Sequence, residues 1–256
     1  MPRIDLNCDA GESYGDWTMG DDAAMFKLVT SVNIACGGHA GDARTMADSI
    51  ALAADNNLGI GAHPSFEDRA NFGRRCLLMT AQEIERMVAY QVGGLAAIAA
   101  LQGITLDHVK AHGALSNLAA VEREVADAIA RATHAISPDL ILLAVAGTQL
   151  QWAGERANLF TVAEGFADRS YDAEGQLVPR SQAGAVIHDA NIAALRCVDM
   201  ASGRGLPRID GGFVACEVQS ICVHGDTPGA VKITAACRQA LELAGYEVES
   251  FSRGRH

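Results

Sequence analysis

The chain has 256 residues, of which 49% are hydrophobic, and its formal net charge is -11 at pH 7. That length and apolar content are enough for one sizeable core, and single α/β barrels commonly reach this size. The negative charge repels phosphate backbones and anionic membranes, which argues against a nucleic-acid-binding or membrane-surface role. Only Lys27, Lys110 and Lys232 are lysines, so chemistry that needs an amine is confined to three positions.

The seven cysteines are scattered, and none forms a Cys-x-x-Cys pair, so neither a zinc ribbon nor a thioredoxin-type redox site is predicted. Free thiols in apolar runs behave as small hydrophobes and suit a reducing cytosol. The chain starts directly with an expected strand, and its apolar stretches, such as residues 92–104, are short or broken by glycine. We therefore expect a cytoplasmic protein without a signal peptide or membrane span.

Short apolar runs alternate with amphipathic helical patterns along the chain. The expected strands are residues 4–8, 32–36, 59–62, 109–112, 140–146, 160–163 and 221–223. The expected helices are residues 43–56, 81–101, 122–133 and 228–243. Thr80 and Glu83 have the spacing of a capping box before the second of these helices. Pro228 is expected in the first turn of the last helix.

Repeated strand–helix units predict right-handed βαβ crossovers and a parallel sheet. No linker or low-complexity segment divides the chain, so we expect one domain over residues 1–256. The pattern favours an α/β fold of the TIM-like (β/α) barrel type with seven strands. An open dinucleotide-binding sheet is disfavoured, because the first strand lacks a Gly-x-Gly-x-x-Gly turn. Residues 168–184 form the longest polar insert, which we expect to be a loop over the site.

Polar residues gather where the expected strands end. In parallel α/β folds the loops at the carboxyl ends of the strands build the active site. Six separate strand ends each carry His, Asp or Glu next to Gly, which is the strongest functional signal in the sequence. The candidate residues from these ends include Asn7, Asp9, Glu12, His39, Asp42, His63, Lys110, His112, Glu164, Arg169 and His224.

Side-chain alternation refines this prediction. Asp5, Asn7 and Asp9 share one face of the first strand, and Lys110 and His112 share one face of the fourth. The outward face of a barrel packs under helices, so these polar residues must face the lumen. Buried carboxylates there need partners, and Lys110 and the histidines are the expected ones. We expect Asp5 to brace the bottom of the barrel outside the site.

Other polar residues carry weaker signals. His108 and His134 lie outside the clusters and are expected to be structural. Arg74 and Arg75 fit either a solvated surface pair or a clamp that binds an anion through bidentate hydrogen bonds.

Several carboxylates, several imidazoles and one amine at one mouth suit general acid–base chemistry on a small polar substrate. The sequence has no Gly-x-x-x-x-Gly-Lys-Ser/Thr segment, so we expect no P-loop in this chain. Asp9, His39 and His63 come from successive strand ends and are compatible with a divalent ion. No His-Glu-x-x-His or similar tight spacing supports such an ion, which leaves a metal site unknown.

These segments resemble the LamB/YcsF family, whose members form the A subunit of bacterial 5-oxoprolinase. The resemblance covers nearly the whole chain and rests on residues 5–15, 33–42, 61–65, 72–75, 109–115, 164–169 and 223–228. Ala111 stands where the family usually has Pro, which alters only local backbone stiffness. Ser116 stands where the family usually has Tyr, so a ring is absent from the expected pocket, which bears on substrate preference.

The resemblance implies a (β/α) barrel of the glycoside hydrolase/deacetylase type. It also implies ATP-dependent hydrolysis of 5-oxoproline to L-glutamate, with release of ADP and phosphate, performed together with subunits B and C. ATP with Mg²⁺ as its counter-ion is the expected cofactor, and no tightly bound cofactor is expected.

In this picture Asp9 or His112 acts as the base towards water, and Lys110 and His63 stabilise developing oxyanion charge. Arg169 or Arg180 holds the carboxylate or phosphate of the substrate. The remaining residues expected to bind substrate are Asn7, Glu12, His39, Asp42, Glu164 and His224. Without a P-loop, nucleotide contacts are expected from Gly37, Gly38 and Arg74.

Two other functions fit the same residues. A metal-dependent deacetylase or amidohydrolase would carry a stoichiometric metal ion and act without ATP. A non-catalytic subunit would bind a small metabolite and present it to a partner enzyme, without turnover of its own.

Overall fold

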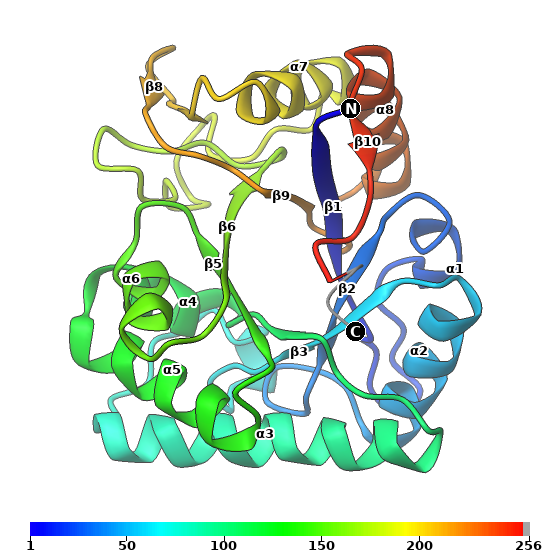
Figure 1. The fold of residues 1–256 in the computed structure, drawn as a ribbon, viewed down its shortest axis with the longest axis vertical. Coiled ribbons are helices and arrows are strands. Elements are labelled where there is room, and N and C mark those ends of the chain that lie inside the picture. The colour runs from blue at the N-terminus through cyan, green and yellow to red at the C-terminus, as the bar shows by residue number, and fades with distance from the viewer. Residues whose placement is uncertain (253–256) are drawn as a thin grey trace.

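Seven parallel strands close into a barrel at the centre of the structure, a computed structural model that describes residues 1–252 (Figure 1). The barrel strands are β1 (Arg3–Ala10), β2 (Ser31–Ala35), β3 (Gly59–His63), β4 (His108–Val109), β5 (Ile141–Val145), β6 (Thr161–Phe166) and β9 (Ser220–Val223). β9 pairs in parallel with both β6 and β1, which closes the barrel. The expected seven-stranded TIM-like barrel is thereby confirmed.

Helices surround the barrel between successive strands. They are α1 (Asp22–Met25), α2 (Ala43–Asp55), α3 (Ala81–Leu101), α4 (Gly113–Val121), α5 (Arg123–Ile136), α6 (Gln149–Arg156), α7 (Ala190–Ala201) and α8 (Ala230–Leu243). The capping box at Thr80 and Glu83 forms as predicted. The prediction for Pro228 is wrong by two residues: Gly229 caps α8 in a left-handed conformation, so Pro228 precedes the helix.

Several helices and strands were not predicted from the sequence. They are the helices α1, α4, α6 and α7, the hairpin β7 (Leu206–Pro207) and β8 (Phe213–Val214), and the strand β10 (Glu247–Val248). The hairpin and α7 belong to the long connection between β6 and β9.

Among the described helices, α3 alone is long and apolar enough to span a membrane by length and composition. The structure packs one face of α3 against β3, α2 and α5. Ile84, Val88, Val92 and Leu95 on that face are fully buried. A helix that covers a barrel core passes the same test, so this is weak evidence for a membrane span.

The alternation of β1 produces a polar lumen. Ile4, Leu6 and Cys8 belong to the apolar core between the barrel and its helices. Asp5 lies on the opposite face, low in the lumen, and accepts hydrogen bonds from the hydroxyls of Thr30, Ser31 and Ser220. Burial raises the pKa of Asp5 to about 6, although these hydrogen bonds oppose the rise. Asp5 therefore braces the barrel, as expected.

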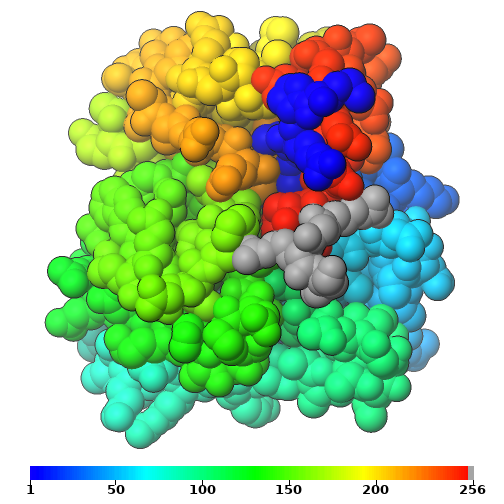
Figure 2. Space-filling model, in the orientation of Figure 1, coloured from blue at the N-terminus to red at the C-terminus, as the bar shows by residue number. Residues whose placement is uncertain are grey.

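The two ends of the described chain meet at the bottom of the barrel. β10 pairs in parallel with the start of β1. Figure 2 shows the first residues, in blue, beside the C-terminal segment, in red. The Ser250 hydroxyl lies 2.9 Å from that of Ser31, which extends the polar lumen downwards. The opposite end of the barrel is where the strands deliver their functional side chains.

Candidate active site

A cavity of about 510 Å³ opens at the carboxyl ends of the strands. Eight of the predicted site residues line it: Asp9, His63, Arg74, Lys110, His112, Arg169, Arg180 and His224. Residues 176–180 also line it, so the polar insert covers the site as expected. Ala111 and Ser116, the two departures from the family pattern, lie on the same wall.

Lys110 is the electrostatic centre of this cavity. Its Nζ lies 2.9 Å from Asp9 Oδ1 and 2.8 Å from Glu164 Oε1, and the side chain is only 4% exposed. Burial alone lowers the pKa of Lys110, but the charges of Asp9, Cys222 and Glu164 outweigh burial and hold it well above its usual range. For Asp9, burial raises the pKa, while the charges of His63 and Lys110 hold it well below normal. The pair is therefore an ammonium and a carboxylate at neutral pH.

A layer of amides lies beneath this pair. Asn7 Nδ2 donates to Glu164 Oε1 and to Ser220 Oγ, and Asn7 Oδ1 accepts from Asn33. Asn7 and Glu164 are thus committed to holding Lys110 and do not line the cavity. His108, expected to be structural, donates from Nε2 to Asn33 Oδ1 at 2.7 Å.

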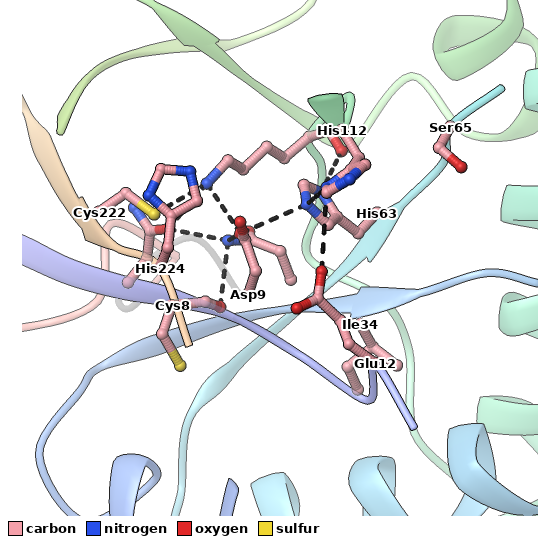
Figure 3. Close-up of polar contacts among 12 residues, drawn as sticks. Cys8, Asp9, Glu12, Ile34, His63, Ser65, His112, Cys222 and His224 are labelled. Carbon is pink, nitrogen blue, oxygen red and sulfur yellow. Dashed lines mark hydrogen bonds and ion pairs between the residues drawn. The ribbon is translucent and has the colours of Figure 1, made fainter. Parts of the chain in front are cut away.

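Three histidines and a glutamate lie together beside the cavity, and two of them, His63 and His112, line it. His63 Nε2 is 3.0 Å from His112 Nδ1, and His39 Nε2 is 3.0 Å from Glu12 Oε1. Figure 3 shows His63, His112 and Glu12 gathered on one side of Asp9. Burial, and then neighbouring imidazole charge, hold the pKa values of His39 and His112 well below normal. Burial, followed by the charges of Asp9 and Asp226, raises the pKa of Glu12 well above normal.

Phe72 packs its ring against this cluster and was not predicted from sequence. The ring meets His39 and His112 edge-on, at centroid distances of 5.1 and 5.3 Å. Phe72 has a φ of 55°, a left-handed conformation that is rare for a bulky residue. Backbone strain of this kind gathers at functional sites. The Phe72 carbonyl accepts a hydrogen bond from His112 Nε2.

His224 and Asp168 form a buried pair across the cavity. His224 Nδ1 donates to Asp168 Oδ1 at 2.9 Å, and the ring stacks on Phe166. Burial raises the pKa of Asp168, but the charge of His224 and hydrogen bonds from His224 and Thr227 lower it overall. No role was predicted for Asp168, although it directly precedes the candidate Arg169 at the end of β6.

The arginines at and near the cavity mouth differ in their partners. Arg169 donates to the carbonyls of Val178 and Ala185, so it anchors the loop over the site. Burial lowers the pKa of Arg169 to about 10. Arg74 pairs with Asp226 at the cavity, whereas the largely exposed Arg75 pairs with the buried Asp68. Burial, and then the charge of Arg74, lower the pKa of Arg180, so two guanidinium groups lie near each other.

Three predicted residues lie at a different cavity. Gly37, Gly38 and Asp42 line this second cavity of about 670 Å³, whose described lining includes no lysine or histidine. Asp42 caps α2 by accepting from the Thr45 amide. Arg74 lines the central cavity instead, so these three residues do not share a cavity with it.

The segment Gly11-Glu12-Ser13-Tyr14-Gly15 has the spacing of a nucleophile elbow. Ser13 Oγ accepts from the backbone amide of Met19, and no helix follows the segment directly. The structure therefore gives Ser13 a turn-forming role and no nucleophile geometry.

Comparison with known proteins identifies the family of this chain. A model of the LamB/YcsF family matches residues 4–256. The A subunit of 5-oxoprolinase from Rhodopseudomonas palustris is 49% identical over 252 residues, which cover 98% of this chain and 99% of that protein. One of the 5-oxoprolinase A subunits of Agrobacterium fabrum is 47% identical over 255 residues, which cover 100% of each chain.

Solved structures extend the comparison to the fold. The lactam utilization protein from Thermus thermophilus has a TM-score of 0.91 at 41% identity, covering 97% of this chain and 100% of that one. A T48 deacetylase, with a TM-score of 0.50 at 13% identity over 96% of this chain and 87% of its own, shows a related fold alone. Because the family model and these relatives match almost from end to end, the chain belongs to the LamB/YcsF family.

Proposed function

We propose that this chain is the A subunit of a cytoplasmic, ATP-dependent 5-oxoprolinase and that the barrel mouth handles the lactam. The observation that carries the proposal is the Lys110 ammonium held between Asp9 and Glu164 at the cavity. The relatives named as 5-oxoprolinase A subunits and as a lactam utilization protein support the substrate class.

The chemistry explains why ATP is needed. A lactam is a resonance-stabilised amide, so its carbon is a poor electrophile. Transfer of the γ-phosphoryl group of ATP to the lactam oxygen releases ADP and activates the ring carbon. Water then adds to that carbon, the C–N bond breaks and the nitrogen takes up a proton. The resulting acyl phosphate reacts with a second water to give glutamate and phosphate.

The residues of the cavity fit these steps. The ammonium of Lys110, with His63 beside it, stabilises negative charge on the substrate oxygen. Asp9 or His112 accepts a proton from the attacking water. Arg180 and Arg74 at the mouth bind the substrate carboxylate or a phosphoryl group. We assign this task to Arg180 over Arg169, because Arg169 already donates to two loop carbonyls.

We further propose ATP with Mg²⁺ as co-substrate and subunits B and C as partners. The word "subunit" in the names of the relatives supports a multi-subunit enzyme. Among the expected nucleotide contacts, Arg74 lies at the central cavity, whereas Gly37 and Gly38 line the second one.

The test is glutamate release from 5-oxoproline, with and without ATP and Mg²⁺, by this chain alone and mixed with its B and C subunits. We expect ATP-dependent glutamate only in the complete mixture. No glutamate from a folded, assembled mixture would refute the proposal. Amide hydrolysis without ATP would favour the metal-dependent amidohydrolase instead.

A further inference from the structure

Beside Asp9, four side chains bring potential ligand atoms close together, and two of their rings, those of His39 and His112, are stacked with centroids 3.7 Å apart. The four atoms are Glu12 Oε1, His39 Nε2, His63 Nε2 and His112 Nδ1, and all lie within 4.8 Å of one another. All four side chains are buried. They come from three strand ends and the loop after β1, so the barrel fold itself brings them together.

Hydrogen bonds on the far side of two rings fix the position of their protons. His63 Nδ1 lies 2.7 Å from the Lys110 carbonyl, and His112 Nε2 lies 2.9 Å from the Phe72 carbonyl. A carbonyl oxygen only accepts, so both of these nitrogens carry hydrogen. In the neutral rings, His63 Nε2 and His112 Nδ1 therefore both present lone pairs, at a separation of 3.0 Å.

The same reasoning applies to His39. Its Nδ1 lies 3.0 Å from Ser65 Oγ, and the hydroxyl proton of Ser65 is already donated to the Phe66 carbonyl. His39 Nδ1 is therefore the donor, which leaves a lone pair on Nε2. That lone pair faces Glu12 Oε1 at 3.0 Å.

Two pairs of hydrogen-bond acceptors therefore face each other in a buried space: His63 Nε2 with His112 Nδ1, and His39 Nε2 with Glu12 Oε1. The two acceptors of each pair repel unless a proton or a cation lies between them. A proton on one imidazole satisfies only the pair of His63 and His112, and a proton on Glu12 satisfies only the pair with His39. A single cation satisfies all four atoms at once.

We propose that Glu12, His39, His63 and His112 bind one divalent transition-metal ion. Three imidazoles and a carboxylate form a donor set that suits zinc. Metal bonds of about 2.0–2.1 Å in a tetrahedron place ligand atoms about 3.3 Å apart. Three of the six pairs of these atoms are separated by 3.0, 3.0 and 3.9 Å, and no pair exceeds 4.8 Å.

The surroundings have the features of a metal site. Histidine ligands commonly donate their second nitrogen to a carbonyl or another acceptor, which orients the ring. Here the Lys110 and Phe72 carbonyls and Ser65 Oγ accept from the three rings. His63 and His112 line the cavity, so the ion is within reach of a substrate. With His112 bound to the ion through Nδ1, Asp9 would be the base towards water, and the ion would supply a Lewis acid, which goes beyond the proposed function.

The test is zinc binding by the full-length chain, measured after removal of metal with a chelator. Elemental analysis and a zinc titration should give one ion per chain, and Co²⁺ should give the visible spectrum of a nitrogen–oxygen site. His39→Ala should weaken zinc binding by more than about 100-fold, and Ser65→Ala, which keeps all four ligands, by about 10- to 100-fold. His134→Ala removes an exposed histidine on α5 and should bind like the wild type.

Zinc should also raise the melting temperature of the wild type and of His134→Ala, but not that of His39→Ala. Equal zinc binding by the wild type and a folded His39→Ala variant would overturn the proposal. If His39→Ala does not fold, unchanged affinity in Ser65→Ala overturns it instead. None of these measurements uses lactam turnover, so a failure of the metal-site proposal can be distinguished from a failure of the proposed function.

Discussion

Lys110 compensates two buried carboxylates at once, which makes it the residue whose loss the molecule should tolerate least. Lys110→Met keeps the length and apolar stem of the side chain but leaves Asp9 and Glu164 without their cation. Removing one partner of a buried ion pair costs about 3–5 kcal/mol of unfolding free energy. Urea unfolding at pH 7 measures this loss.

The matched control is Lys232→Met on α8, where the lysine is exposed. A surface change of this kind should alter stability by less than about 0.5 kcal/mol. Equal stability of Lys110→Met and Lys232→Met would show that the central ion pairs do not hold the barrel together.

Asp5 gives the barrel a pH-dependent stability. Its pKa rises from 3.8 to about 6 on folding, so the folded state binds the proton more tightly than the unfolded state. The stability from Asp5 is therefore complete below about pH 4 and is lost as the pH rises through 6. This difference in pKa corresponds to about 3 kcal/mol of unfolding free energy.

Asp5→Asn removes this titration and retains an acceptor for the hydroxyls around it. The unfolding free energy of the wild type minus that of Asp5→Asn should decrease between about pH 4 and pH 6.5 and then level off. Denaturant unfolding at half-unit pH steps checks this. A difference that stays constant, or grows with pH, contradicts the raised pKa.

At the scale of elements, β3 and β4 meet at a position that requires glycine. A Cβ on Gly61 would lie 2.1 Å from His108 Nε2, the atom that donates to Asn33 beneath the active centre. Gly61→Ala should displace His108 and cost about 1–3 kcal/mol through overpacking. Thermal unfolding measures the loss.

Gly93→Ala is the matched control, because Gly93 lies within α3 and its added Cβ meets nothing within 4 Å. Alanine in place of glycine inside a helix is worth about 0.5–1 kcal/mol, so this variant should be slightly more stable than the wild type. Similar melting temperatures for the two variants would mean that β3 and β4 can separate without cost.

Some elements could be predicted from the sequence and others could not. The polar alternation of β1 and the Gly-rich strand ends predicted the barrel and several of the polar residues that line the cavity, because both depend on local spacing. Helix α4 was missed because its N-cap, His112, makes no side-chain capping bond, and Gly113 begins it with a φ of 55°.

The other features that the sequence did not predict are contacts between residues far apart in the chain. The pairing of His224 with Asp168 joins residues 56 positions apart, and the His39–Glu12 contact spans 27. Nothing in the local pattern fixes such pairs. For the same reason, the sequence did not reveal that the loop after β2 sends Gly38 to the second cavity and His39 to the histidine cluster.

At the scale of the whole molecule, the barrel places the Lys110 ammonium beside the Asp9 carboxylate in a cavity that residues 176–180 cover. The bottom is closed by β10 and by hydroxyl-rich side chains around Asp5. The hydroxyl cluster around Asp5 and the cavity that holds Lys110 and Asp9 thus lie at opposite ends of the barrel.

The most direct test of this account is Asp9→Asn in the complete mixture of subunits, with glutamate and ADP both measured over time. Asparagine keeps the size of Asp9 but removes the charge that faces Lys110 and His63. We predict that glutamate formation falls by at least about 100-fold, the contribution of a general base, while circular dichroism shows a folded chain. Glutamate formation at the wild-type rate would contradict the placement of the reaction at the barrel mouth.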